Sequence, residues 1–134
     1  MRSVRLPILV IAAALIVTAC SGSSTREAFT ELVPPEEAAR VLDEADDTLV
    51  LLDVRTPDEF SQARIAGAIN IDFYEADFGD RLAELDRAAT YVVYCRTGNR
   101  SATAVQMMQE LGFDYIYELD GGIADWYEAG YPIE

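Results

Sequence analysis

The sequence predicts an α/β domain whose parallel sheet is covered by helices on both faces. From about residue 29 onward, segments with strand composition alternate with segments of helical periodicity, which is the order of elements in parallel α/β folds. Two of the strand segments, residues 48–54 (TLVLLDV) and 91–94 (YVVY), are nearly unbroken apolar runs. Such runs are typical of strands that are buried on both faces of a parallel sheet.

The first half of the predicted domain, which covers residues 29–134, holds three strands and two helices. These are, in order, a strand over 29–33, a helix over 35–42, a strand over 48–54, a helix that starts at residue 57 and a short strand within 66–71. The first helix begins with proline and glutamates, which favour a helix amino terminus. Thr56 is a suitable N-cap for the second helix, with Pro57 in its first turn. Asp53 is the polar residue at the carboxyl end of the second strand.

The second half continues the alternation with three helices and two strands. These are a helix over 81–88, a strand over 91–94, a helix over 99–111, a strand over 115–119 and a helix over 122–128. Leu82 and Leu85 give the first of these helices an apolar face. In the second, apolar residues recur at every third position, namely Ala102, Val105, Met108 and Leu111. Gly112 is a suitable stop for that helix.

The chain is strongly acidic and contains no histidine. Its 134 residues carry 24 acids and ten basic side chains, all of them arginine, for a formal charge of −14. Such a field repels nucleic acid, which is therefore not an expected partner; solubility is the simplest role of the charge, and a high-salt habitat is the alternative. Without histidine, the usual neutral-pH base and most zinc-site designs are missing. We therefore expect no metal and no cofactor, and chemistry that uses Cys, Asp, Glu, Tyr or Arg.

Residues 1–20 have the proportions of a lipoprotein signal peptide. Two arginines precede an apolar stretch over 6–17, and small residues stand directly before Cys20. The segment Val17–Cys20 (VTAC) also resembles the bacterial lipobox, in which the cysteine becomes the lipidated first residue of the mature protein. We therefore expect lipidation at Cys20, a flexible spacer over 21–28 and a lipid-anchored location on the extracytoplasmic side of the cell membrane. An uncleaved anchor and a secreted protein with an ordinary Cys20 thiol are the alternatives.

The segment Cys95–Arg100 (CRTGNR) is the candidate site for chemistry. It lies between a buried strand and a helix start, and ligands of open α/β sheets bind beyond the carboxyl ends of the strands. Successive backbone N–H groups and the helix amino terminus make such a loop an anion cradle, and Gly98 permits its tight turn. Arg96 and Arg100 add positive charge, so we expect the pKa of Cys95 to fall from ~8.5 toward ~3.5–7.5. Cys95 is then a thiolate nucleophile at neutral pH.

A thiolate in an anion cradle supports two chemistries, attack on phosphorus or transport of a sulfur atom. Tyrosine phosphatases use a seven-residue Cys-x5-Arg loop, generally preceded by histidine, whereas here Arg100 closes a six-residue loop and Tyr94 precedes it. The shorter loop favours a single sulfur over a phosphoryl group. A phosphatase or arsenate reductase, a non-enzymatic cell-surface binding module and an inert buried cysteine remain as alternatives.

Several stretches of the chain, in matching order and spacing, resemble a single-domain rhodanese. They are residues 51–55 (LLDVR), 59–60 (EF), 67–71 (GAINI), 92–101 (VVYCRTGNRS) and 120–122 (DGG) with Trp126. The resemblance implies a three-layer α/β/α fold with a doubly wound, five-stranded parallel sheet. It also implies a sulfurtransferase, in which Cys95 takes sulfane sulfur from a small donor such as thiosulfate and passes it to a thiol or another nucleophilic acceptor.

The same resemblance assigns roles to the residues around Cys95. Arg96, Thr97, Gly98, Asn99 and Arg100 match the active-site loop of the family and are expected to bind substrate. Independently of the resemblance, Asp53 and Arg55 are expected to have a supporting role, in the hydrogen-bond network of the neighbouring strand end, rather than a direct catalytic one. Arg100 is expected to pair with Asp53 or another acid and also to act through its charge. Where the family usually has His-Ile-Pro-Gly-Ala, this chain has Arg64 at the histidine position, which we expect to be a solvated surface charge.

Overall fold

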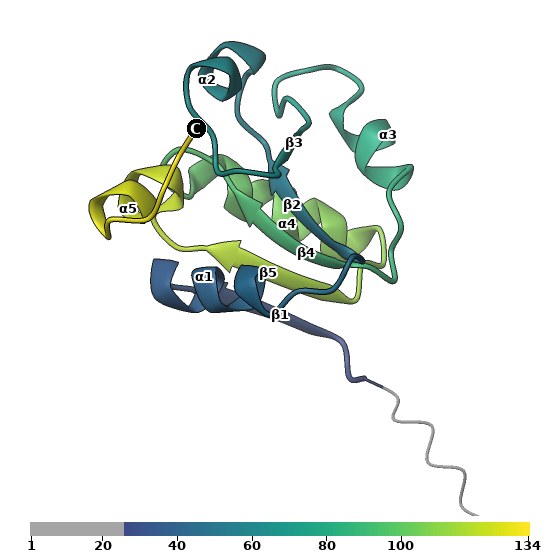
Figure 1. Cartoon of the computed structure of the whole chain (residues 1–134). Coiled ribbons are helices and arrows are strands. Elements are labelled where there is room, and N and C mark those ends of the chain that lie inside the picture. Colours follow the sequence, from purple (N-terminus) through teal and green to yellow (C-terminus); the bar gives the residue numbers. More distant parts are fainter. Residues whose placement is uncertain (1–25) are drawn as a thin grey trace, which may run out of the picture.

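A single parallel sheet forms the centre of the computed structural model, which describes residues 26–134 (Figure 1). Its strands are β1 Phe29–Val33, β2 Leu49–Asp53, β3 Ile69–Asn70, β4 Thr90–Tyr94 and β5 Tyr115–Leu119. All pairings are parallel, and the strand order is β1-β5-β4-β2-β3. This order confirms the predicted doubly wound sheet of five strands, with β4 at its centre.

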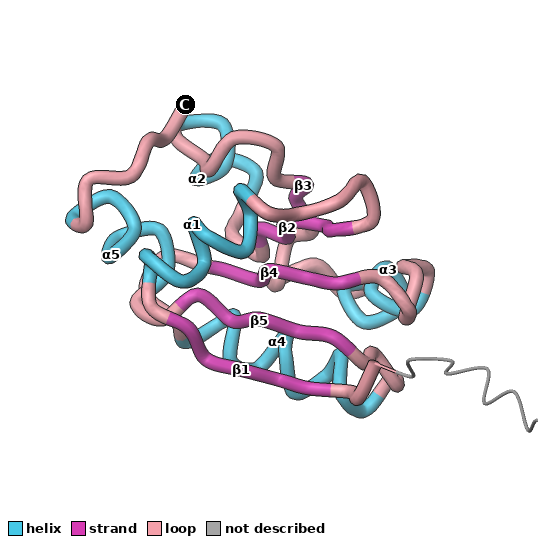
Figure 2. The backbone as a smooth tube through the Cα atoms, turned by 60° about the horizontal axis from the view of Figure 1, so that its bottom comes forward, coloured by secondary structure: helices cyan, strands magenta, loops and turns pink. Residues whose placement is uncertain are grey.

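Helices cover both faces of the sheet, so that the fold has three layers (Figure 2). The helices are α1 Pro35–Asp43, α2 Pro57–Gln62, α3 Phe78–Ala83, α4 Asn99–Glu110 and α5 Gly122–Glu128. Buried residues of α1 and α5 pack on one face, and those of α3 and α4 pack on the other. The short helix α2 buries no residue and follows the carboxyl end of β2. Within residues 26–134, no helix combines the length and the apolar character that crossing a bilayer requires.

The central strand β4 is buried along its whole length, as its apolar sequence predicted. Tyr91 and Val93 point to the layer of α3 and α4, whereas Val92 and Tyr94 point to the layer of α1 and α5. Alternate residues therefore enter two separate cores. Burial of each large apolar side chain contributes about 1.5–3 kcal/mol, so β4 holds the two layers together and places the residue that follows it, Cys95, in a rigid setting.

Two helices differ from the predictions. The helix expected over 81–88 is α3, Phe78–Ala83, because Phe78 and Leu82, one turn apart, are its buried residues and Leu85 is only partly buried. The long helix α4 has the expected position, but the three-residue spacing was the wrong pattern for its buried face. That face consists of Ser101, Ala104, Val105 and Met108, and Ala102 is exposed.

The predictions for the amino-terminal segment lie outside the described residues. These are the signal peptide over 1–20, lipidation at Cys20 and most of the spacer over 21–28. The described chain starts next to the sheet, where the Tyr115 hydroxyl donates a hydrogen bond to the backbone oxygen of Arg26 at 3.1 Å.

Candidate active site

Cys95 lies directly after β4, in a loop that leads into α4. Cys95 is only 1% exposed, whereas Arg96, Thr97 and Asn99 of the same loop are exposed. Gly98 has a φ of 103° and occupies the N-cap position of α4, a left-handed conformation that favours glycine. This turn points the Gly98 N–H toward the Cys95 sulfur, at an N–Sγ distance of 3.1 Å. The loop therefore wraps its backbone donors around the thiol.

The pKa of the Cys95 thiol is lowered, which is the direction expected for a thiol in this loop. Burial raises this pKa, but hydrogen bonds from the Ser101 hydroxyl and from backbone N–H groups of Ser101, Gly98 and Thr97 outweigh it. Hydrogen bonds to the charged form are a general cause of a lowered pKa. The loop geometry thus favours the thiolate, and the charge of Arg100 interacts with the same sulfur.

Arg100 is held by Glu59, a residue that the sequence did not single out for the site. The guanidinium donates two hydrogen bonds to the Glu59 carboxylate, at 2.7 and 2.8 Å. Glu59 also forms a capping box with Thr56 at the start of α2, so the cap connects α2 to the cradle. These Arg100 hydrogen bonds lower the pKa of Glu59 to about 2, although burial acts in the opposite direction. The T-x-x-E pattern at 56–59 was visible in the sequence as a capping signal.

Asp53 and Arg55 form a buried ion pair at the end of β2, and Arg100 does not join it. The two side chains are 0% and 5% exposed, and the Nε atom of Arg55 lies 2.9 Å from Oδ2 of Asp53. Arg55 also donates to the backbone oxygen of Ala63 at 2.6 Å. The pair therefore forms a hydrogen-bond network at the end of β2, and the contact that it makes beyond the strand is with the chain after α2. Arg100 was expected to pair with Asp53 or with another acid, and its partner in the structure is the other acid, Glu59.

The amino terminus of α5 is fastened to the backbone of the loop. Ile123 N–H donates to the Cys95 oxygen at 2.9 Å, and Ala124 N–H donates to the Arg96 oxygen at 3.1 Å. Gly122 comes so close that a Cβ atom there would lie 2.5 Å from the Cys95 oxygen. The second glycine of the DGG stretch, Gly122, is thus required by a backbone-to-backbone contact with the active loop.

Arg64 is a surface charge, with a side chain that is 35% exposed, and it also pairs with Glu134 at the carboxyl end. Its Nε donates to Glu134 Oε1 at 2.9 Å, and the backbones of the two residues exchange hydrogen bonds. The guanidinium also lies 5.1 Å from the ring centre of Phe60. At the position where the family usually has histidine, this chain therefore has an arginine that connects Glu134 with Phe60 of α2.

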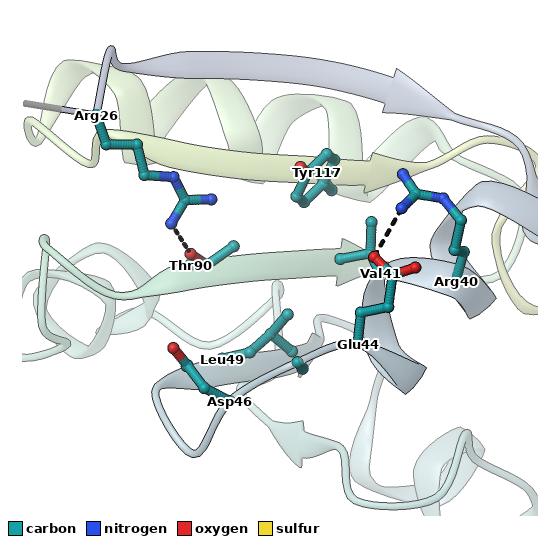
Figure 3. Close-up of a pocket in the computed structure, with 9 residues that line it drawn as sticks. Arg26, Arg40, Val41, Glu44, Asp46, Leu49, Thr90 and Tyr117 are labelled. Carbon is teal, nitrogen blue, oxygen red and sulfur yellow. Dashed lines mark hydrogen bonds and ion pairs between the residues drawn. The ribbon is translucent and has the colours of Figure 1, made fainter. Parts of the chain in front are cut away.

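Two cavities show how the site differs from other surfaces of the domain. One, of about 330 Å³, lies beside the loop and is lined by Arg55, Glu59 and Arg96, among others. The other, of about 210 Å³, lies at the amino ends of the strands and contains none of the expected site residues (Figure 3). Its arginines are engaged within the chain, since Arg26 donates to Thr90 and Arg40 pairs with Glu44.

Comparisons with known proteins agree with this geometry. The family model of the rhodanese-like domain matches residues 34–129. The chain is 37% identical over 103 residues to the thiosulfate sulfurtransferase GlpE of Pseudomonas putida, with 76% of this chain and 88% of that protein covered. It is 32% identical over 101 residues to a sulfurtransferase of Allochromatium vinosum, with 75% and 92% covered.

The fold is likewise similar to a solved structure of a rhodanese-related protein from Thermoplasma volcanium. That similarity has a TM-score of 0.68 and 33% identity, and it covers 78% of this chain and 97% of the other. The family match spans strands β2 to β5, the five helices and the whole Cys95–Arg100 loop. The chain therefore belongs to the rhodanese-like domain family.

Proposed function

We propose that the protein is a sulfurtransferase that carries sulfane sulfur on Cys95 as a persulfide. The donor is a small sulfur compound such as thiosulfate, and the acceptor is a thiol or another nucleophile. The observation that carries the proposal is the setting of Cys95: a six-residue loop directs the Gly98 N–H to its sulfur at 3.1 Å. Relatives named as sulfurtransferases support the same chemistry.

The reaction has two displacements, both at sulfur. The Cys95 thiolate attacks the outer sulfur of thiosulfate, the S–S bond of the donor breaks, and sulfite leaves with the bonding electrons. The product is an S–S⁻ group on Cys95, whose negative charge the loop N–H groups and the amino terminus of α4 stabilise. The acceptor then attacks the terminal sulfur, and the Cys95 thiolate leaves. No net oxidation occurs, and the charge is conserved in each step.

The intact mass after thiosulfate treatment tests the proposal. We expect the protein to gain the mass of one sulfur atom, and to lose it again when cyanide or a thiol is added. Cys95→Ser is the control, because it removes the nucleophile and leaves Cys20 as the remaining cysteine. No gain in the wild type, or an equal gain in Cys95→Ser, contradicts the proposal. Turnover of an aryl phosphate that depends on Cys95 would favour the phosphatase alternative instead.

We also propose that the protein is anchored outside the cytoplasmic membrane through a lipid on Cys20. The support is the sequence pattern of residues 1–20, in which VTAC follows a short apolar stretch. Mass spectrometry of the membrane fraction tests this location. The expected mature amino terminus is a diacylglyceryl-modified Cys20; a different terminus contradicts the lipid anchor and leaves the sulfur chemistry unaffected.

A further inference from the structure

A half-buried carboxyl group, Glu118, reaches the active cysteine through one hydroxyl. Ser101 is fully buried, and its Oγ atom lies 2.8 Å from Oε1 of Glu118. The same Oγ atom lies 3.5 Å from Sγ of Cys95. Its third neighbour is the Gly98 oxygen at 3.0 Å, an acceptor that it shares with the Ala102 N–H. Ser101 therefore bridges an acid and the sulfur nucleophile.

Counting protons along this bridge shows that its two ends depend on each other. A hydroxyl has one proton to donate and lone pairs to accept. When Cys95 is a thiol, it donates to Ser101, which donates to the Glu118 carboxylate. When Cys95 is a thiolate, it needs the Ser101 proton, and Glu118 must then carry a proton and donate to Ser101. If both ends are ionised, the single hydroxyl proton can serve only one of the two anions, and the other loses this donor.

We propose that Glu118 is a positioning residue for Cys95, because its proton decides whether the Ser101 hydroxyl donates to the carboxylate or to the sulfur. With Glu118 protonated, the hydroxyl stabilises the thiolate. With Glu118 ionised, the hydroxyl turns to the carboxylate and the sulfur loses this donor. The consequence for sulfur loading rests on the proposed function, since loading starts from the thiolate.

The surroundings of Glu118 favour its protonated form. Burial raises the pKa of its carboxyl group above the ordinary value, against the effect of the Ser101 hydrogen bond, and the charge of Asp120 adds to the rise. Its partners on the neighbouring strands are Val93 of β4 and Leu32 of β1, which carry no charge.

From α4, the Ser101 hydroxyl reaches Glu118. The Arg100 guanidinium at the start of the same helix is engaged by Glu59. Asp120 is the other carboxylate that acts on Glu118. The described residues thus give Glu118 no direct cationic partner, so its proton and Ser101 determine how it acts on Cys95.

The titrations of both ends test the proposal. Coupled groups titrate as a pair, and the interaction appears on whichever group ionises second. We therefore measure the pH dependence of Cys95 alkylation by iodoacetamide in wild type and Glu118→Gln, and the NMR titration of the Glu118 carboxyl in wild type and Cys95→Ala. Peptide mass spectrometry assigns the alkylation to Cys95. We expect at least one of these apparent pKa values to fall in the variant by about one unit or more.

The Ser101→Ala background separates the hydrogen-bonded bridge from a simple charge effect. Without the hydroxyl, the shift between Glu118 and Glu118→Gln should disappear, because the two ends no longer share a proton. Glu110→Gln, at the exposed far end of α4, removes the same charge and should leave both titrations unchanged. A shift in neither titration, or a shift of the same size in Ser101→Ala, overturns the proposal. Neither readout requires sulfur transfer, so failure of the proposed function remains a separate result.

Discussion

At the scale of single residues, Glu59 connects the helix cap of α2 with the cradle around Cys95. Its carboxylate accepts from Thr56 and from the guanidinium of Arg100, whose side chain is only 15% exposed. Arg100 would otherwise be a largely buried cation with an unmet donor pair. The position of this arginine at the closing end of the loop thus depends on an acid from another element.

Glu59→Gln should destabilise the protein by about 1–3 kcal/mol at pH 7, because Arg100 loses a charged partner while still partly buried. The folded pKa of Glu59 is about 2, below its ordinary value of 4.5. A lowered folded pKa contributes stability above the unfolded pKa, and this contribution is lost as the pH falls toward the folded pKa. The difference between wild type and variant should therefore shrink between about pH 4.5 and pH 2. Urea unfolding at several pH values measures it.

The exposed residue Glu75 provides the matched control for this prediction. Glu75→Gln removes the same charge from the acidic chain but no ion pair with the loop, so its free energy of unfolding should stay within about 0.5 kcal/mol of the wild type. An equal loss of stability in both variants would mean that net charge, and not the Arg100 pair, is responsible.

At the scale of elements, the contact between α5 and the active loop is a backbone contact that leaves no room for a side chain. Gly122 has a φ of 62°, and a Cβ there would lie 2.7 Å from the Arg96 carbonyl atoms. Gly122→Ala should therefore push α5 away from the loop, lower the free energy of unfolding and slow alkylation of Cys95. Urea unfolding and the alkylation rate measure the two effects.

Gly130→Ala separates backbone strain from the clash. Gly130 has a φ of 86°, and a Cβ there would meet no atom within 4 Å, so alanine encounters only the left-handed backbone, at roughly 1–2 kcal/mol. Gly122→Ala should lose about 1–3 kcal/mol more than this, and only this variant should slow the alkylation. Equal effects of the two substitutions would show that the contact with the loop is unimportant.

The elements also show which parts of the fold were predictable. Apolar runs and caps are local signals, so the strand over 29–33, the buried strand over 48–54 and the cap at Thr56 could be predicted. The helix α3 could not be placed correctly, because Leu82 fits a helical face with either Phe78 or Leu85. Phe78 is the buried one because this helix packs against α4. The sequence around Leu82 does not indicate that contact.

The candidate site likewise has one part that could be predicted from the sequence and another that could not. The loop residues from Cys95 to Arg100 are contiguous, so their common position at the end of β4 followed from the sequence. Glu59 lies 41 positions before Arg100, and Glu118 lies 17 positions after Ser101. Such pairings depend on how α2, α4 and β5 meet in space, which the spacing along the chain does not show.

At the scale of the whole molecule, the net charge opposes the local charge of the site. Residues 26–134 contain all 24 acids and only eight arginines, a formal charge of −16. The loop, by contrast, carries the exposed Arg96 and the Arg100 that is paired with Glu59. At about 10 mM salt the Debye length is roughly 30 Å, larger than the radius of gyration of roughly 13 Å expected for 100 residues. At about 150 mM it is roughly 8 Å. At low salt, a reagent at Cys95 therefore experiences the charge of the whole domain. At higher salt, it experiences only the charges of the nearby loop.

Anionic reagents should consequently react faster with Cys95 as salt is added. Iodoacetate and iodoacetamide differ by one charge, so the ratio of their rates cancels changes in the fraction of thiolate. We expect this ratio to rise roughly two- to tenfold between about 10 and 150 mM salt, and the rate of sulfur loading from thiosulfate to rise in parallel. A ratio that falls with salt would mean that Arg96, Arg100 and the loop N–H groups attract anions more strongly than the acidic surface repels them, so that the cradle alone sets the access of donors.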